Sequence, residues 1–178
     1  MVSKKRSEDQ LTYFFIALVV ALIVAPIVSI IPSKHQRALS QIRQMARAAG
    51  LRVDLVKVED PDPDPDRYIS GTGRPLAREL SVAAWRLPRP RPRDWRSMPL
   101  VDWEIVRVGG EWRWIGDPPT PDGFASYVAE ELITMPSGIV KVEEKSYQLT
   151  VYWHEHADQI SADLVIRFLK SCLERPTH

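Results

Sequence analysis

Two histidines separated by one residue are the clearest pair of potential metal ligands in this chain. His154 and His156 lie in the stretch WHEHAD at residues 153–158. If this stretch continues a strand, alternate side chains share one face, so the two imidazoles lie side by side and Glu155 or Asp158 supplies an oxygen. The spacing therefore predicts a zinc or copper site at His154 and His156. The alternative is that both are polar residues at the end of a strand, with His156 capping the next helix.

The motifs of common catalytic sites are missing from the sequence. It contains no G-x-S-x-G, no H-E-x-x-H and no G-x-x-x-x-G-K stretch. Cys172, the single cysteine, falls in a segment with helical periodicity, where we expect a small buried hydrophobe. We therefore predict no catalytic residue, no cofactor and no small-molecule substrate, which favours a protein that acts by binding.

Two proline-rich runs carry opposite charge: EDPDPDPDR at residues 59–67 and RLPRPRPRDW at residues 86–95. Alternating prolines favour polyproline II, in which successive charged side chains point in different directions. This splay argues against a calcium site, which needs convergent oxygens. The first interpretation is two solvated connectors. The alternative is that the second run docks on an acidic or aromatic-lined protein partner through a set of four residues, namely Arg89, Arg91, Arg93 and Trp95. The nearby acidic run argues against nucleic acid.

The elements that position these residues begin with an apolar segment. Residues 13–31, YFFIALVVALIVAPIVSII, carry no charge over nineteen residues. At about 1.5 Å per residue they cover nearly the hydrocarbon thickness of a bilayer, roughly 30 Å, and they have no polar stripe. We therefore predict a transmembrane helix over residues 13–32, stopped by Pro32, behind an N-terminal tail at residues 1–12.

A cleaved signal peptide is the competing interpretation of the N-terminus, since MVSKKR is a basic leader. The apolar run exceeds the usual length of about 7–15 residues, and no A-x-A-like site follows it. Orientation depends on the flanking cations. Three precede the run and five follow it, namely Lys34, Arg37, Arg43, Arg47 and Arg52. The positive-inside rule then predicts a single-pass membrane protein with its soluble domain in the cytoplasm.

A basic amphipathic helix is expected over residues 33–50, with Ser33 as the N-cap and Gly50 just beyond the C-terminus. Its apolar stripe is narrow and rich in alanine. The helix either lies on anionic headgroups or packs on the domain that follows. In the first case the lipid bilayer is a partner, and the membrane-surface residues are Lys34, Arg37, Arg43 and Arg47.

One uncharged N-terminal segment followed by PSKHQRALSQIRQMARAAGLRV resembles the layout of the small accessory subunit of the bacterial preprotein translocase. It also resembles other single-pass membrane proteins of bacteria. The resemblance covers about the first fifty residues and implies a membrane anchor with an accessory role. The tryptophan-rich strands and the helices further on are not expected of that subunit's small domain, so a translocation role is not carried over.

The remaining chain, residues 51–178, reads as one α+β domain with the two proline-rich runs as loops. Alternation predicts strands over 51–59, with a bulge near Leu55, and over 79–87. A hairpin over 101–116 turns at Gly109-Gly110, and a second over 139–153 turns near 143–146. Helices are expected over 122–135, with Asp122 as the cap, and over 157–173, which buries Ile160, Leu164, Phe168 and Cys172 or their neighbours.

Short connections favour antiparallel pairing, so we expect a sheet of about six strands in the order β-β-β-β-α-β-β-α, with the helices on one face. The sequence as a whole predicts a membrane-anchored, non-catalytic interaction or accessory protein with a protein partner at the membrane. The alternative is a metal-binding protein or metal-dependent enzyme that uses His154 and His156. A formal net charge of +1 gives no overall field to recruit nucleic acid.

Overall fold

The structure is a computed structural model that describes residues 13–23, 33–98, 101–117 and 123–175. The chain divides into two compact units, Met1–Arg37 and Ala38–His178. The predicted tail at 1–12 and residues 24–32 of the predicted transmembrane segment lie outside the described residues, as does the predicted cap Asp122.

In the first unit, residues 13–23 are helical and all of their side chains are exposed. No helix within the described part of the chain combines the length and the apolar character needed to cross a membrane. Ser33 begins the next helix with a capping box, because its Oγ accepts a hydrogen bond from the Gln36 backbone N–H and the Gln36 side chain accepts one from the Ser33 N–H.

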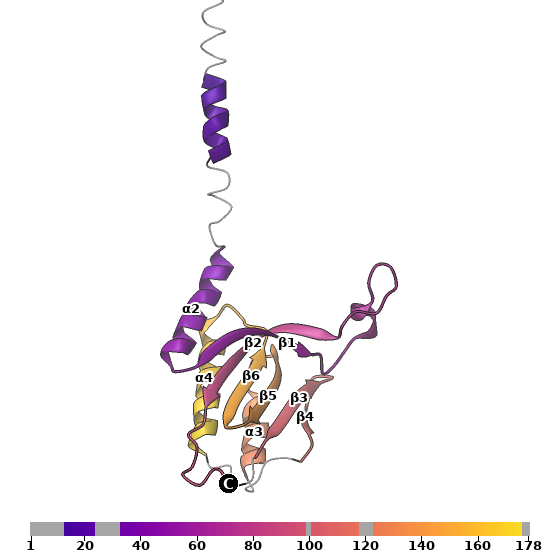
Figure 1. Cartoon of the computed structure of the whole chain (residues 1–178), viewed down its shortest axis with the longest axis vertical. Coiled ribbons are helices and arrows are strands. Elements are labelled where there is room, and N and C mark those ends of the chain that lie inside the picture. Colours follow the sequence, from indigo (N-terminus) through magenta and orange to yellow (C-terminus); the bar gives the residue numbers. More distant parts are fainter. Residues whose placement is uncertain (1–12, 24–32, 99–100, 118–122, 176–178) are drawn as a thin grey trace, which may run out of the picture. The chain divides into compact units, whose positions relative to one another are not determined.

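The second unit is an α+β domain, as predicted (Figure 1). Its elements in chain order are α2 (Lys34–Ala48, which starts in the first unit), β1 (Arg52–Glu59), the 3₁₀-helix η1 (Pro65–Tyr68), β2 (Glu79–Pro88), β3 (Trp103–Val108), β4 (Glu111–Ile115), α3 (Phe124–Ile133), β5 (Ile139–Lys145), β6 (Gln148–Trp153) and α4 (Gln159–Glu174). The predicted order of strands and helices is confirmed within the described residues.

The six strands form one antiparallel sheet in the order β1-β2-β6-β5-β3-β4. The β5–β6 hairpin is therefore inserted between the β1–β2 and β3–β4 hairpins. The burial pattern agrees with this order, because the last five residues of β6 are buried and β4 has no buried residue. The central position of the last hairpin brings the ends of β2, β5 and α4 together.

One face of the sheet carries the main core and the helices. Three tryptophans are essentially inaccessible there, Trp85 on β2, Trp103 on β3 and Trp153 on β6. Trp85 and Trp153 meet edge to face with ring centroids 5.1 Å apart. Helix α2 contributes Ile42 and Ala46 to this core, α3 contributes Phe124, Val128 and Leu132, and α4 contributes six residues, namely Ala162, Val165, Ile166, Phe168, Leu169 and Cys172.

The other face of the sheet has a smaller apolar cluster that corrects one prediction. The pairing of β1 with β2 runs without a shift from Arg52 to Glu59, so the bulge expected near Leu55 is wrong. Val56 and Val58 pack instead against Leu80 and Val82 on the second face. The apparent change of parity in the sequence therefore reflects a strand with apolar residues on both faces.

Local predictions within the domain largely hold. Gly109 and Gly110, both at positive φ, turn the β3–β4 hairpin, and Arg107 pairs with Trp112 across it, with the guanidinium 5.8 Å from the ring centroid. The second hairpin turns at Ser146-Tyr147, slightly later than expected. Ile160 is exposed, contrary to expectation. Asp158 caps α4, and the buried face of the helix begins with Ala162 and Val165.

Candidate functional site

The two predicted metal ligands lie just beyond β6, in the segment that leads to α4. Both His154 and His156 are exposed. The His154 N–H donates a hydrogen bond to the Gly138 carbonyl at 2.9 Å, and the His156 ring stacks on Trp153 with centroids 6.3 Å apart. A Cβ at Gly138 would lie 2.9 Å from His156 Nε2, so the glycine gives the imidazole room to pack. His156 therefore packs at the end of the strand through its ring, whereas His154 is held there through its backbone.

The oxygens expected to complete a metal site have other partners. Glu155 accepts hydrogen bonds from Trp85 Nε1 at 2.9 Å and from Arg43 Nε at 2.7 Å. Asp158 accepts one from the Ser161 N–H at 2.8 Å, which caps α4 and lowers the pKa of the Asp158 carboxyl. Among the described residues, no three His, Cys, Asp or Glu side chains are grouped so that they could hold a metal ion. The arrangement offers two imidazoles without a third ligand.

An open groove of about 470 Å³ lies beside this segment. Leu39 and Arg43 of α2 form part of its wall. The rest is formed by residues 55–57 of β1, residues 81–83 of β2 and residues 153–155. Its apolar surface includes Leu55, which is 69% exposed although it lies on the core face of the sheet. The groove exists because β1 and β2 extend past the end of β6, where Ala83 pairs with Trp153. Its lining includes Arg43, a predicted membrane-surface residue, and His154, a predicted metal ligand.

The four predicted membrane-surface cations fall into two groups. Lys34, Arg37 and Arg47 are exposed. Arg43 differs, because its side chain is only 26% exposed and its guanidinium forms an ion pair with the carboxylate of Glu155, whose side chain is 4% exposed. Within α2, the packing of Ile42 and Ala46 and the Arg43 ion pair favour contact with the domain. Lys34, Arg37 and Arg47 are the residues of this set that remain open to a headgroup.

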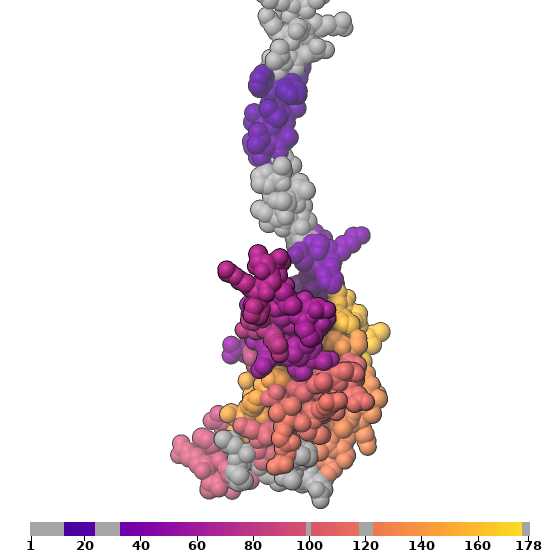
Figure 2. Space-filling model, turned by 90° about the vertical axis from the view of Figure 1, so that its right-hand side faces the viewer, coloured from indigo at the N-terminus to yellow at the C-terminus, as the bar shows by residue number. Residues whose placement is uncertain are grey.

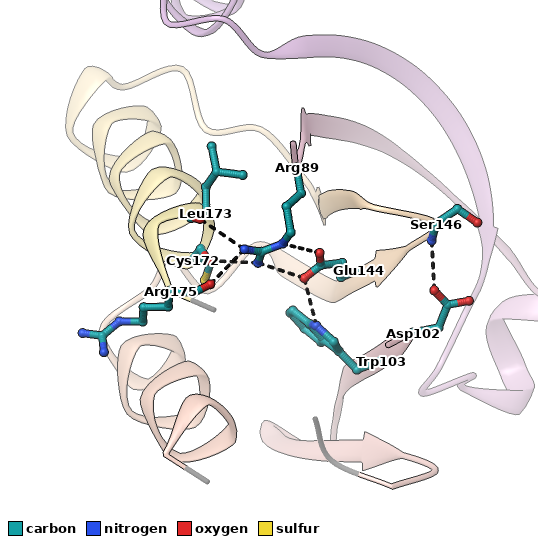
Figure 3. Close-up of polar contacts among 8 residues, drawn as sticks. All are labelled: Arg89, Asp102, Trp103, Glu144, Ser146, Cys172, Leu173 and Arg175. Carbon is teal, nitrogen blue, oxygen red and sulfur yellow. Dashed lines mark hydrogen bonds and ion pairs between the residues drawn. The ribbon is translucent and has the colours of Figure 1, made fainter. Parts of the chain in front are cut away.

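The predicted partner-binding residues also fall into a buried and an exposed group. Arg89 turns inward at the end of β2, and its side chain is only 8% exposed (Figure 3). Its guanidinium meets both oxygens of the Glu144 carboxylate and donates to the carbonyls of Cys172, Leu173 and Arg175 at 2.9 to 3.1 Å. These are carbonyls at the C-terminal end of α4, which carry the negative end of the helix dipole. Arg89 is thus a structural cation that joins β2, β5 and α4.

Glu144 is the buried partner of this cluster and is 2% exposed. Besides both bonds from Arg89, it accepts a hydrogen bond from Trp103 Nε1 at 3.2 Å. The sequence contained a signal for this residue, because alternation along β5 places Glu144 on the same face as Val142. A carboxylate at a core position requires a cation, and Arg89 supplies it.

The residues after Arg89 form an exposed basic turn, which we define as Arg91, Arg93, Trp95 and Arg96. The expected polyproline extension ends here, because the Trp95 N–H bonds to the Pro92 carbonyl and the Ser97 N–H to the Asp94 carbonyl. The Arg91 guanidinium lies 4.7 Å from the centroid of the half-buried Trp95 ring, and that of Arg96 lies 5.4 Å from it. The three cations are exposed. The turn is therefore the most basic surface feature of the predicted partner-binding run.

The acidic run is folded and makes its own contacts. Asp60 is buried and accepts hydrogen bonds from the Tyr68 hydroxyl and the Asp62 N–H. Asp62 accepts one from the Gly109 N–H, and Asp64 caps η1. Among the described residues, no three carboxylates of this run are grouped so that they could hold a metal ion. No ion pair among the described residues joins this run to the basic turn.

A polar network on the second face of the sheet was not predicted. Glu143 accepts hydrogen bonds from the Tyr152 hydroxyl at 2.7 Å and from Lys145 Nζ at 2.9 Å, and Lys141 Nζ lies 2.9 Å away. Burial raises the pKa of Glu143, but the bonds from Lys145, Tyr152 and Lys141 outweigh it, so the pKa is lowered. Burial, together with the bond to Glu143, raises the pKa of Tyr152 to about 12.

Lys145 completes this network, and its bond to Glu104 at 2.7 Å, followed by the one to Glu143, raises its pKa. The groups neutralise one another, so the network stabilises the strand pairing and has no spare charge for a ligand. Cys172 lies on the other face, where burial raises the pKa of its thiol. A buried thiol with a raised pKa is a poor nucleophile, so the structure gives it a packing role.

Comparison of the chain with protein-family models, with curated proteins and with solved structures gives no match. The resemblance of the N-terminal layout to the accessory subunit of the preprotein translocase therefore stays a prediction. The functional conclusion depends on the geometry of this chain alone.

Proposed function

We propose that this chain is a single-pass protein of the bacterial inner membrane that binds another component at the membrane surface and catalyses no reaction. Residues 13–31 anchor it in the bilayer. The α+β domain lies on the cytoplasmic side, where it acts as an accessory or interaction module.

The observation that carries this proposal is the exposure of the helical residues 13–23. All eleven side chains are exposed, and those of the large residues range from 45% for Leu18 to 72% for Tyr13. Leaving such a surface in water costs about 25 cal/mol per Å², whereas lipid hydrocarbon removes that cost. Because the uncharged run continues to Ile31 in the sequence, a bilayer is the environment that suits the whole segment.

The charges that follow the apolar run support the orientation. Lys34 and Arg37 are exposed on the first turns of α2. Cations near an anionic leaflet contribute about 1 kcal/mol each, and they favour the cytoplasmic side. Arg43 contributes to the fold of the domain through Glu155, so contact with headgroups is left to the exposed Lys34, Arg37 and Arg47.

The surfaces of the domain support a binding role. The groove beside α2 combines exposed Leu55 with half-buried Leu39, and the basic turn presents three exposed guanidiniums. Of the candidate metal ligands, His156 stacks on Trp153, and the neighbouring Glu155 is held by Arg43 and Trp85. We therefore favour recognition of a macromolecule over metal chemistry.

The proposal is tested by the topology of the full chain in bacterial cells. Two reporters are fused in turn after His178, one that is active only in the cytoplasm and one that is active only outside it. We expect activity from the cytoplasmic reporter, in the membrane fraction. Activity from the external reporter alone would contradict the orientation, and activity of the cytoplasmic reporter in the soluble fraction would contradict the anchor.

A further inference from the structure

The basic turn presents cations that form no ion pair within the part of the domain that the structure describes. Arg91, Arg93 and Arg96 are exposed, and none of them takes part in an ion pair between described residues. Most other cations on the sheet do have such partners, for example Arg86 with Asp54 and Lys145 with Glu104. The only acid within the turn is Asp94, so residues 91–96 carry a net charge of +2 from three arginines and one aspartate.

Arg89 holds the start of this turn in one position. Its backbone N–H bonds to the Tyr147 carbonyl at 2.8 Å, and its guanidinium is fixed by Glu144 and by three carbonyls at the end of α4 (Figure 3). Pro90 and Pro92 restrict the backbone on both sides of Arg91. The turn is therefore preorganised, which lowers the entropy that a partner must overcome on binding.

Trp95 then fixes the relative positions of two of the cations. The guanidiniums of Arg91 and Arg96 both pack on its ring, while Arg93 makes no side-chain hydrogen bond or ion pair with a described residue. Figure 2 shows this segment, coloured pink, projecting from the body of the domain. Each guanidinium can bind a carboxylate through two parallel hydrogen bonds, so three exposed guanidiniums on one turn suit a partner that presents several carboxylates.

We propose that the basic turn binds an acidic segment of a partner protein, through Arg91, Arg93 and Arg96 with Trp95 as the apolar contact. This inference rests on the proposed function, in which the domain is a recognition module.

The test uses the full chain in nanodiscs of neutral phosphatidylcholine. The probe is a fluorescent peptide, EDPDPDPDR, whose acidic residues are spaced along an extended chain, and the control peptide is ENPNPNPNR. We expect saturable binding of the acidic peptide and no binding of the control peptide. Because several charge contacts are involved, the affinity for the acidic peptide should fall by at least about tenfold between roughly 50 and 200 mM salt.

Two triple variants with the same change of charge separate the turn from the general charge of the protein. We expect R91Q/R93Q/R96Q to reduce affinity for the acidic peptide at least tenfold. The matched control R74Q/R78Q/R113Q removes three other exposed arginines and should change affinity less than twofold. Equal losses in the two variants would overturn the proposal, provided that both variants unfold at the same temperature as the wild type.

Other occupants of the turn give different results. If vesicles with phosphatidylglycerol bind the turn and the acidic peptide does not, the surface recognises lipid and the proposal fails. It also fails if the full chain self-associates through the turn and the peptide does not compete. Failure of the anchor is distinguishable, because the chain would then stay out of the nanodiscs and still bind the peptide in solution.

Discussion

The Arg89 guanidinium faces the Glu144 carboxylate, with Nε 2.5 Å from Oε1 and Nη2 3.0 Å from Oε2. The pair is almost fully buried, so each charge depends on the other and on the hydrogen bonds around it. The remaining guanidinium protons point to the carbonyls at the end of α4. This one contact connects strands β2 and β5 to the last helix, and it positions the basic turn.

Removing one partner of this pair should destabilise the domain strongly. R89M leaves the Glu144 charge buried without a cation, and we expect a loss of about 3–5 kcal/mol in the free energy of unfolding. The double variant R89M/E144M removes both charges and should recover much of that loss. Thermal and urea unfolding of the full chain in a mild detergent measure this, with R93Q as an exposed control. A double variant as unstable as R89M would contradict the account.

The lowered pKa of Glu143 predicts acid sensitivity of the second face. Since the folded pKa lies below the ordinary value of 4.5, the ionised carboxylate contributes stability that is present above that pH and is lost as pH falls through the folded pKa. Over the range from pH 5 to pH 2, E143Q should lose less stability than the wild type. E111Q, at an exposed carboxylate, should follow the wild type. The measurement is urea unfolding against pH.

The contacts of His154 and His156 predict weak metal binding. Because Glu155 and Asp158 are engaged elsewhere, two imidazoles alone should give low affinity for zinc and copper. Isothermal titration should therefore find the same affinity in the full chain and in H154A/H156A. A clear loss of affinity in the double variant would restore the metal-site alternative.

Burial of Cys172 predicts a thiol that is inert in the folded protein. Its pKa is raised and its side chain is inaccessible, so little thiolate forms and reagents cannot reach it. Iodoacetamide should modify Cys172 only after unfolding in urea. Rapid modification of the folded chain would show that α4 opens more readily than its packing indicates.

Local sequence patterns predicted the parts of the fold that depend on neighbours in the chain. The Gly109-Gly110 hairpin, the capping of α2 at Ser33 and the last helix follow from turn chemistry, caps and periodicity, although the cap of that helix is Asp158 and not His156. The insertion of β5–β6 between the other hairpins did not follow, because it depends on packing between strands far apart in the sequence. The bulge near Leu55 was wrong, since a strand with two apolar faces has the same pattern.

The environment of the site residues also depends on contacts between segments that are far apart in the sequence. Arg89, Arg91 and Arg93 have nearly the same Arg-Pro context, yet Arg89 is internal because β2 ends beside β6 and near Glu144. Likewise, nothing adjacent in the sequence joins Arg43 to Glu155, which are 112 positions apart. The type of each residue predicted that it could serve as a surface cation or as a metal ligand. The tertiary contacts decide which of these residues stay exposed.

The most direct test of the central claim is extraction of the full chain from bacterial membranes. The account predicts that it stays with the membrane in alkaline carbonate and floats with lipid in a density gradient, whereas a chain without residues 13–31 is released. Release of the full chain by carbonate would contradict a membrane-anchored protein.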